Sequence, residues 1–137
     1  MGDWSSDGNS VAFTVQSGPD RGIYIRNPDG VNEYRVTDAL DYNPIWSPDS
    51  RQLAFLSTRD KNAEIYIMDA DGGNLKRLTE SDAPEYHLSW SPNGQSLLFV
   101  SERDGNPEIY TVTKSGPRPT RLTFNTTDDN QPVWSPG

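Results

Sequence analysis

Three acidic residues each stand five positions before a tryptophan: Asp41, Glu85 and Asp129. Clustered carboxylate oxygens suit hard cations such as calcium, and a ring of acids would also concentrate a basic peptide by its field. One interpretation is therefore a cation or ligand site wherever the fold brings these acids together, with calcium as the candidate ion. The interpretation that we favour is that each acid accepts backbone hydrogen bonds from a neighbouring inter-blade loop, as aspartate commonly does in turns.

A second set of polar residues lies two positions after each acid: Asn43, His87 and Gln131. His87 is the only histidine and cysteine is absent, so we expect no transition-metal site and no disulfide. No Gly-x-Ser-x-Gly segment is present to expose a nucleophile. We therefore predict no catalytic residue, and we interpret these three positions as polar members of the same candidate ligand or cation site as the acids.

These residues sit inside an internal repeat, which is the strongest signal in the chain. The pattern begins with a tryptophan and a serine, at intervals of 42, 44 and 44 residues, at Trp4, Trp46, Trp90 and Trp134. Seven residues after the first three of these come the apolar runs Val11-Ala12-Phe13, Leu53-Ala54-Phe55 and Leu97-Leu98-Phe99. An Ile-Tyr pair and an Arg-x-Thr triplet follow at constant offsets, so every length change lies between the threonine and the next tryptophan.

Within one unit, short β-branched and aromatic runs alternate with turn residues, as in an antiparallel meander. In the middle unit we predict strands at 43–46, 52–57, 64–68 and 75–78. Four short strands repeating at this period indicate a blade of a β-propeller. The predicted fold is all-β and a single propeller segment: blades at about 1–40, 41–83 and 84–127, with an extra innermost strand at about 128–137.

The composite pattern resembles a known family. Its residues are Trp46-Ser47-Pro48-Asp49, the run from Gln52 to Phe55, the segment from Ile65 to Gly73, and Arg77-Leu78-Thr79. This is similar to the WD-like repeat of TolB-type propellers. The resemblance implies that the acidic positions line the central channel of a six-bladed ring, and it implies periplasmic protein-protein contact as a function.

Three blades are half of such a ring, and alone they would expose the flat faces of the first and last blades. We therefore predict a homodimer that closes a six-bladed ring and binds a protein, peptide or small ligand at the channel mouth. The assembly strand would be Asn130, Gln131, Pro132, Val133 and Trp134, exchanged between copies. Two alternatives are an excised or engineered half propeller whose only property is assembly, and a hydrolase that uses the channel carboxylates.

The net charge and the lack of long apolar runs argue against some classes of partner. Twenty acidic against twelve basic residues give a net charge of -8, which disfavours nucleic acid and anionic membranes. No run of eighteen apolar residues exists, so we predict no membrane insertion, and we find no export signal in the given sequence. The sequence does not fix a cellular location.

Other repeated residues have structural interpretations. We expect Trp46 and Trp90, with Tyr24, Tyr66 and Tyr110, to pack between blades. We expect Arg35, Arg77 and Arg121 to pair with nearby acids. The segment from Asp69 to Gly73 looks like the start of a calcium loop, but no helices flank it, and we predict a hairpin turn there.

Overall fold

The structure is a computed structural model that describes residues 2–38, 40–81, 83–115 and 119–123, and it contains three antiparallel β-sheets of four strands each. The first comprises β1 Gly2–Trp4, β2 Val11–Val15, β3 Gly22–Arg26 and β4 Glu33–Arg35. The second comprises β5 Asp41–Trp46, β6 Gln52–Ser57, β7 Glu64–Asp69 and β8 Lys76–Arg77. The third comprises β9 Glu85–Trp90, β10 Ser96–Ser101, β11 Glu108–Thr113 and β12 Thr120–Arg121.

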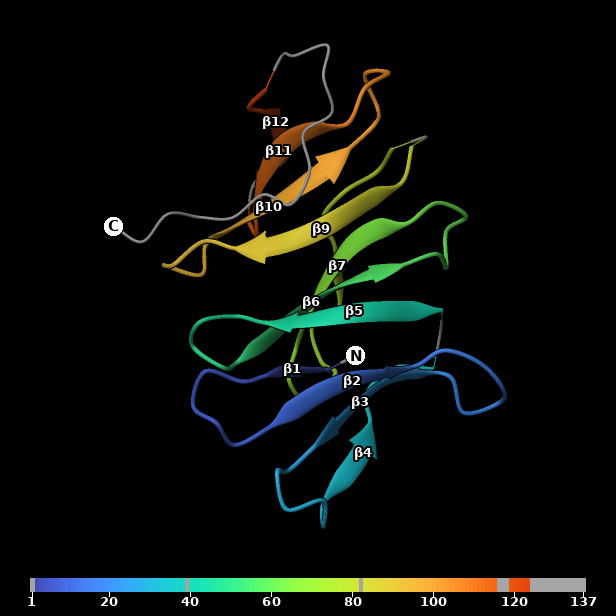
Figure 1. Ribbon diagram of the computed structural model, residues 1–137, viewed down its shortest axis with the longest axis vertical. Coiled ribbons are helices and arrows are strands. Elements are labelled where there is room, and N and C mark those ends of the chain that lie inside the picture. Colours follow the sequence, from blue (N-terminus) through green and yellow to red (C-terminus); the bar gives the residue numbers. More distant parts are fainter. Residues whose placement is uncertain (1, 39, 82, 116–118, 124–137) are drawn as a thin grey trace.

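Each sheet is one propeller blade, because its four strands pair in sequence order. Figure 1 shows the blades stacked along the long axis, from β1–β4 through β5–β8 to β9–β12. The described residues form a partial, open propeller. The prediction of three four-stranded blades is confirmed, and the expected extra strand at 128–137 lies outside the described residues. Among those residues, no helix is long and apolar enough to cross a bilayer.

The turn after each tryptophan closes the first hairpin of its blade. In the middle blade, Ser47 Oγ donates to Asp49 Oδ1 at 2.6 Å and accepts from Gln52 N at 3.0 Å. These bonds bring Trp46 opposite Leu53 and so set the register of β5 against β6. The other blades repeat the serine-acceptor pair with Asp7 and Asn93. The Trp-Ser-x-Asp/Asn pattern is therefore a device that sets strand register.

The apolar core lies between the blades. One cluster joins blades 1 and 2 and contains Ala12, Ile23, Ile25, Trp46, Leu53, Phe55, Tyr66 and Met68. The other joins blades 2 and 3 and contains Ala54, Leu56, Ile65, Ile67, Leu78, Trp90, Leu97, Phe99, Tyr110 and Val112. The middle blade thus uses one face of its sheet for each of its two neighbours, as the alternation of side chains along a strand requires.

The repeated tryptophans join each blade to the one before it. Trp46 Nε1 donates to the carbonyl oxygen of Asp3 at 3.1 Å, and Trp90 Nε1 donates to that of Ile45 at 3.2 Å. Both indoles are buried in the inter-blade clusters. The predicted packing of Trp46 and Trp90 between blades is confirmed.

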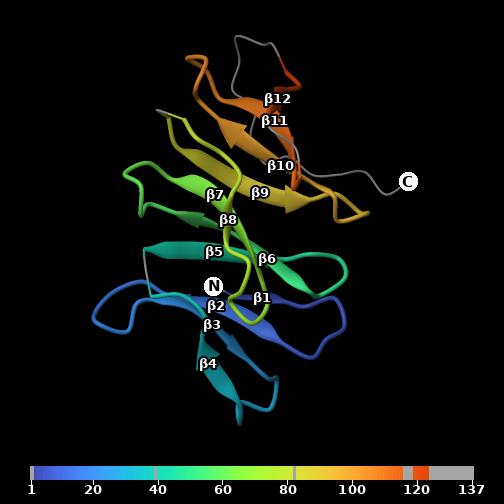
Figure 2. The same ribbon diagram turned by 180° about the vertical axis from the view of Figure 1, so that it is seen from behind.

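The segment between β7 and β8 is a hairpin turn, as predicted. Asp69 N donates to Gly73 O at 2.8 Å, and Gly72 N donates to Asp69 O at 2.8 Å. Gly72 has a φ of 90°, a conformation that a side chain would strain. The turn also reaches blade 1, where Tyr34 Oη donates to Ala70 O at 3.4 Å (Figure 2). It therefore links the outer edges of two blades.

Candidate functional site

The two described acids of the repeated set are buried and paired with arginines. Asp41 is 2% exposed and Glu85 is 1% exposed. Arg59 Nη2 donates to Asp41 Oδ2 at 2.5 Å, and Arg103 Nη2 donates to Glu85 Oε1. Each acid therefore accepts a hydrogen bond from an arginine of its own blade. Asp129 lies outside the described residues.

Each arginine is held in place by two further contacts. Arg59 Nε donates to Ser57 Oγ at 2.9 Å, and its guanidinium carbon lies 4.8 Å from the centre of the Tyr66 ring. Arg103 repeats this with Ser101 at 3.0 Å and Tyr110 at 4.8 Å. A guanidinium that is stacked on an aromatic ring and bonded at two edges is strongly oriented.

One oxygen of each buried carboxylate has no hydrogen-bond partner in the described part of the chain: Asp41 Oδ1 and Glu85 Oε2. Burial raises the pKa of the Glu85 carboxyl to about 7, and this outweighs the opposing effect of Arg103. An unsatisfied buried acceptor costs free energy, so each orphan oxygen is a place where a donor would be stabilising.

The arginine partners were missed by the sequence reasoning, although a signal exists. Ser57-x-Arg59-Asp60 and Ser101-x-Arg103-Asp104 recur at the spacing of the repeat. Blade 1 has Val15 and Ser17 at the positions of Ser57 and Arg59. The Ser-x-Arg-Asp segment therefore marks the two blades that bury an inner-strand acid.

A second network lies at the outer edge of blades 2 and 3. Glu64 accepts from Thr79 Oγ1 at 2.7 Å and lies 3.6 Å from Arg77 Nη2. In blade 3, Arg121 Nη2 donates to Glu108 Oε1 at 3.0 Å. The predicted acid pairing is confirmed for Arg77 and Arg121. These contacts join strands within a blade.

Arg35 departs from that pattern. Its Nε donates to the carbonyl oxygen of Thr37 at 2.9 Å, and its Nη2 donates to that of Arg21. The expectation of an acidic partner is wrong for Arg35, because blade 1 has Gly22 where blades 2 and 3 have Glu64 and Glu108. Backbone carbonyls take the place of the missing carboxylate.

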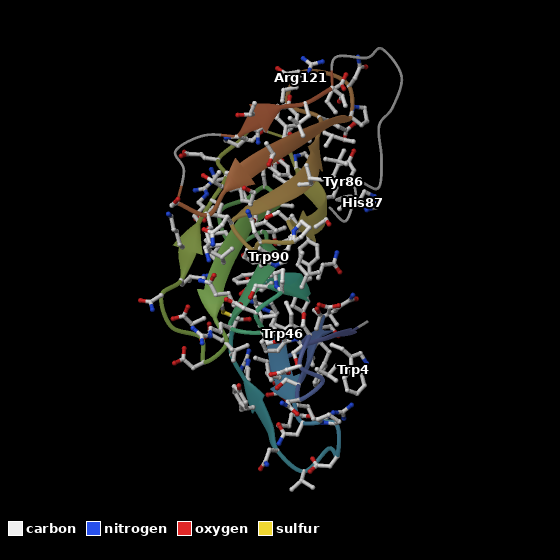
Figure 3. All side chains as sticks on the ribbon, turned by 90° about the vertical axis from the view of Figure 1, so that its left-hand side faces the viewer. Trp4, Trp46, Tyr86, His87, Trp90 and Arg121 are labelled. Carbon is white, nitrogen blue, oxygen red and sulfur yellow. The ribbon has the colours of Figure 1, made fainter. Side chains whose placement is uncertain are left out.

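Asn43 and His87 lie on a bulge of the inner strand. Their φ angles are 53° and 56°, and both side chains are exposed. The register of the inner strand shifts at this bulge in both blades. Figure 3 shows Tyr86 and His87 together at the margin of the molecule, with ring centres 5.3 Å apart. Gln131 lies outside the described residues.

Replacing His87 with asparagine should raise the free energy of unfolding by about 0.5 kcal/mol, because asparagine tolerates the left-handed conformation better than histidine. Blade 2 already has asparagine at this position. Urea denaturation of the two proteins measures the change. A loss of stability would mean that the His87–Tyr86 ring contact outweighs the backbone strain.

The described residues contain no group of three or more histidine, cysteine, aspartate or glutamate side chains arranged to hold a metal ion. Asp41 and Glu85 each form an ion pair with an arginine. A calcium site at the acids is therefore not assembled from the described part of one chain alone.

Blade 1 has one sheet face that packs on no other described blade. This face carries the residue types that are buried between blades at the equivalent positions of blades 2 and 3. Trp4 is 58% exposed, whereas Trp46 is 7% and Trp90 is 9% exposed. Figure 3 shows these three tryptophans following one another along the molecule. Register places Val11 and Phe13 on the face of Trp4, and Phe13 stacks on Tyr24 at 5.6 Å. This set, Trp4, Val11, Phe13 and Tyr24, is called the open face below.

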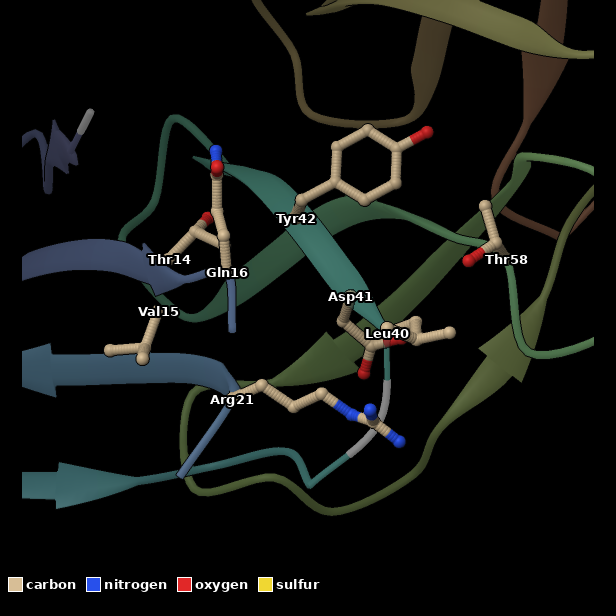
Figure 4. A pocket seen from close by; sticks show the side chains of 8 residues that line it. All are labelled: Thr14, Val15, Gln16, Arg21, Leu40, Asp41, Tyr42 and Thr58. Carbon is tan, nitrogen blue, oxygen red and sulfur yellow. The ribbon is translucent and has the colours of Figure 1, made fainter. Parts of the chain in front are cut away.

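A cavity of about 270 Å³ lies between blades 1 and 2. Its walls are Thr14, Val15, Gln16, Arg21, Leu40, Asp41, Tyr42 and Thr58. Figure 4 shows the Asp41 carboxylate on the wall, between the ring of Tyr42 and the side chain of Arg21. Burial raises the pKa of the Tyr42 hydroxyl. The cavity brings Asp41 together with residues that the sequence did not single out; His87 is not among its walls.

Known proteins share this architecture. The sequence profile of the TolB beta propeller domain matches residues 2–137. A putative TolB from Agrobacterium tumefaciens superposes with a TM-score of 0.78 and 25% identity, and TolB from Acinetobacter baumannii with 0.80 and 25%. The β-propeller domain of the Trilobed protease from Pyrococcus furiosus superposes with 0.70 and 21%. No curated protein sequence matches significantly.

The matches cover most of this chain but less than half of the others. They cover 88%, 97% and 89% of this chain, and 47%, 34% and 41% of the respective structures. The three blades therefore correspond to a part of a larger propeller protein in each case.

Proposed function

The chain belongs to the TolB β-propeller domain family, and from that premise we propose that it is a non-catalytic binding scaffold that pairs with a second copy to close a six-bladed ring. The ring would present its channel mouth to a protein, peptide or small ligand. The observation that carries the proposal is the open face of blade 1.

The open face matches the two faces that do dock on a preceding blade. Trp46, Leu53, Phe55 and Tyr66 pack on blade 1, and Trp90, Leu97, Phe99 and Tyr110 pack on blade 2. Their equivalents in blade 1 are Trp4, Val11, Phe13 and Tyr24. The described residues bury Val11, Phe13 and Tyr24 only in part and leave Trp4 58% exposed, and an apolar docking face left open in this way is of the kind that marks an interface.

A second copy is the occupant that we propose for this face. Propellers close with four to eight blades, so three blades are too few and twice three falls within the range. Two copies related by a two-fold axis would cover both open ends with the same pair of surfaces. Exchange of Asn130–Trp134 would add a strand to each contact, but these residues lie outside the described part.

The buried ion pairs support a scaffold over a hydrolase. General acid-base chemistry needs two carboxylates in different environments and within reach of substrate. Asp41 and Glu85 occupy equivalent positions, are inaccessible, and each meets an arginine. The repeat thus uses these acids for the stability of each blade.

Replacing Val11 with aspartate should convert the closed dimer to a monomer, because a buried unpaired charge would face the second copy. The matched control is Val31→Asp, since Val31 is 77% exposed in a loop away from the open face. Light scattering with size exclusion is the measurement, and the wild type and control should have a mass near twice 15.3 kDa. A wild-type monomer at every concentration, or a dimer that survives Val11→Asp, would contradict the proposal.

A further inference from the structure

The inner strand of blade 1 is shorter than the inner strands of the other two blades. β5 has six residues and pairs with β6 as far as Asp41↔Ser57, and β9 has the same length and the equivalent pairing with β10. β1 has three residues and pairs with β2 only from Val11 to Phe13. The last two residues of β2 therefore have no inner-strand partner in the described part of the chain.

The cavity between blades 1 and 2 lies beside this part of β2. Thr14 and Val15 hold the positions of Leu56 and Ser57, which pair with β5 in blade 2. In blade 1 both residues line the cavity, together with Tyr42 of β5 (Figure 4). A strand edge without a neighbour is a template for a further strand, so the cavity is an open place in the sheet of blade 1.

We propose that the segment Asp129–Trp134 of a second copy docks along this edge of β2. Its first two residues would fill the cavity, and its last three would take the place of β1. The inference rests on the proposed function, because it names the site and the register by which the two copies of the ring are joined. The segment itself lies outside the described residues.

The first argument is the sequence of the segment. It reads Asp-Asn-Gln-Pro-Val-Trp, and β5 reads Asp-Tyr-Asn-Pro-Ile-Trp. The acid, the proline and the tryptophan are therefore at the same positions in both. The register of β5 on β6, transferred to blade 1, places Asp129 opposite Val15 and Asn130 opposite Thr14. These are the two residues of β2 that line the cavity and lack an inner-strand partner among the described residues.

The length of the connection selects the second copy as the source of this strand. Glu85 begins the inner strand of blade 3 six positions after Thr79 of blade 2, and Asp129 follows Thr123 of blade 3 by the same six positions. A connection of this length leads from one blade to its neighbour. Blade 1 of the same chain lies beyond blade 2 (Figure 1), whereas blade 1 of the second copy is the next blade in the proposed ring.

The second argument is the charge of the cavity wall. Arg21 lines the cavity, its side chain is exposed, and it forms no ion pair with an acid of the described part of the chain. In blades 2 and 3 the inner-strand acids Asp41 and Glu85 each pair with an arginine, but blade 1 has Ser17 at the position of that arginine. Asp129 would bring an acid into the cavity, and Arg21 would be its counter-ion.

The third argument is that β1 is held by few contacts. It has only three residues, and Trp4 is 58% exposed. Trp46 Nε1 donates to the carbonyl oxygen of Asp3, and Val133 would present a carbonyl at the same position. The bond from Trp46 N to Asp3 Oδ2 would be lost. A six-residue strand in place of β1 makes more ladder hydrogen bonds, which favours the exchange.

Cysteine cross-linking of the full chain tests the strand and its register, since the chain has no cysteine of its own. Thr14→Cys combined with Asn130→Cys places thiols on opposed residues, whose Cα atoms would lie about 4.5–5.5 Å apart, within reach of a disulfide. Oxidation should give a dimer that persists in SDS and separates on reduction. The control is Val11→Cys with Asn130→Cys, which is about 10 Å out of register and should run as a monomer.

The cross-linking outcomes separate this inference from ring closure. A disulfide within one chain would mean that the segment docks on its own blade 1, and equal linkage of the control pair would mean that no register is fixed; either result contradicts the inference. A wild type with a mass near twice 15.3 kDa, whose paired cysteines at 14 and 130 stay unlinked, would contradict the inference and support ring closure. A monomeric wild type contradicts both.

A charge exchange tests the role of Arg21 without cysteines. Arg21→Glu should raise the dissociation constant of the dimer about tenfold or more, because two negative charges would then meet in the cavity. Adding Asp129→Arg to the same chain should recover most of the affinity. Arg51→Glu makes the same charge change on an exposed arginine outside the cavity and should leave the dimer as it is. Light scattering over a dilution series measures the four proteins, and a double variant that dimerises no better than Arg21→Glu would overturn the assigned ion pair.

Discussion

Replacing Arg103 with methionine should lower the free energy of unfolding by about 3–5 kcal/mol near pH 8, because it leaves the buried Glu85 carboxylate without its counter-ion. Glu85 is 1% exposed, and its second oxygen already lacks a partner. Methionine keeps much of the length of the arginine stem, so the variant removes mainly charge and hydrogen bonds. Urea denaturation of the wild type and the variant measures the effect.

The cost should be smaller near pH 5, and the sign follows from the pKa of Glu85. Burial raises that pKa from 4.5 to about 7 in the folded chain, so between these values the folded state binds more protons than the unfolded state. This group therefore adds stability below pH 4.5 that is lost as the pH rises through about 7. Without Arg103, Glu85 stays protonated to higher pH, and a neutral acid needs no counter-ion.

Two comparisons separate charge from packing. Glu85→Leu combined with Arg103→Met should recover much of the stability, since no uncompensated charge remains. Arg103 also lies 5.7 Å from the centre of the Phe99 ring. If Arg103→Met costs as much near pH 5 as near pH 8, the loss of this ring contact explains the effect, and the proposed role of the ion pair is wrong.

Replacing Phe55 with alanine should lower the free energy of unfolding by about 3–5 kcal/mol, because the ring is fully buried between blades 1 and 2. Phe99 holds the same position between blades 2 and 3, and Phe99→Ala should cost a similar amount. Phe55 stacks on Tyr66 at 5.9 Å, and Phe99 stacks on Tyr110 at 5.8 Å.

Phe13 is the blade 1 equivalent of Phe55 and Phe99, and its replacement tests whether a second copy covers the open face. Phe13 stacks on Tyr24 like its counterparts but is only half-buried in one chain. In a monomer, Phe13→Ala should cost about 1 kcal/mol or less, whereas a docked second copy would raise the cost towards that of Phe55→Ala. Thermal or urea denaturation at several protein concentrations measures all three variants. Equal, concentration-independent costs for Phe55→Ala and Phe13→Ala would contradict this account of the open face.

Much of the fold was predictable because the repeat makes each local signal appear three times. The turn after Trp46 and the run from Leu53 to Phe55 placed the first hairpin, and the structure has β5 and β6 there. The outermost strands were less well placed: β8 has only Lys76–Arg77, where 75–78 was expected. Short edge strands have few hydrogen bonds and little burial, so their ends depend on neighbouring loops.

The candidate site was only half predictable. The period drew attention to Asp41 and Glu85, but as open carboxylates at a channel mouth rather than as buried partners of arginines. Register explains the difference: Asp41 lies opposite Ser57, and this pairing brings Arg59, eighteen residues away in the chain, against the carboxylate. Side-chain pairs of this kind depend on the alignment of two strands, which no local pattern contains.

By itself, the sequence determined the all-β blades, their turns and the inter-blade tryptophans, because these follow from local residue types that recur every 42 to 44 residues. Only the tertiary structure decided which charges are buried, where a cavity opens and which face the described residues leave open. Asp41 is buried because it pairs with Arg59 from the turn after the neighbouring strand, and Trp4 is exposed because no described blade packs against it. The physical basis of these features is burial and long-range contact, which only the folded chain possesses.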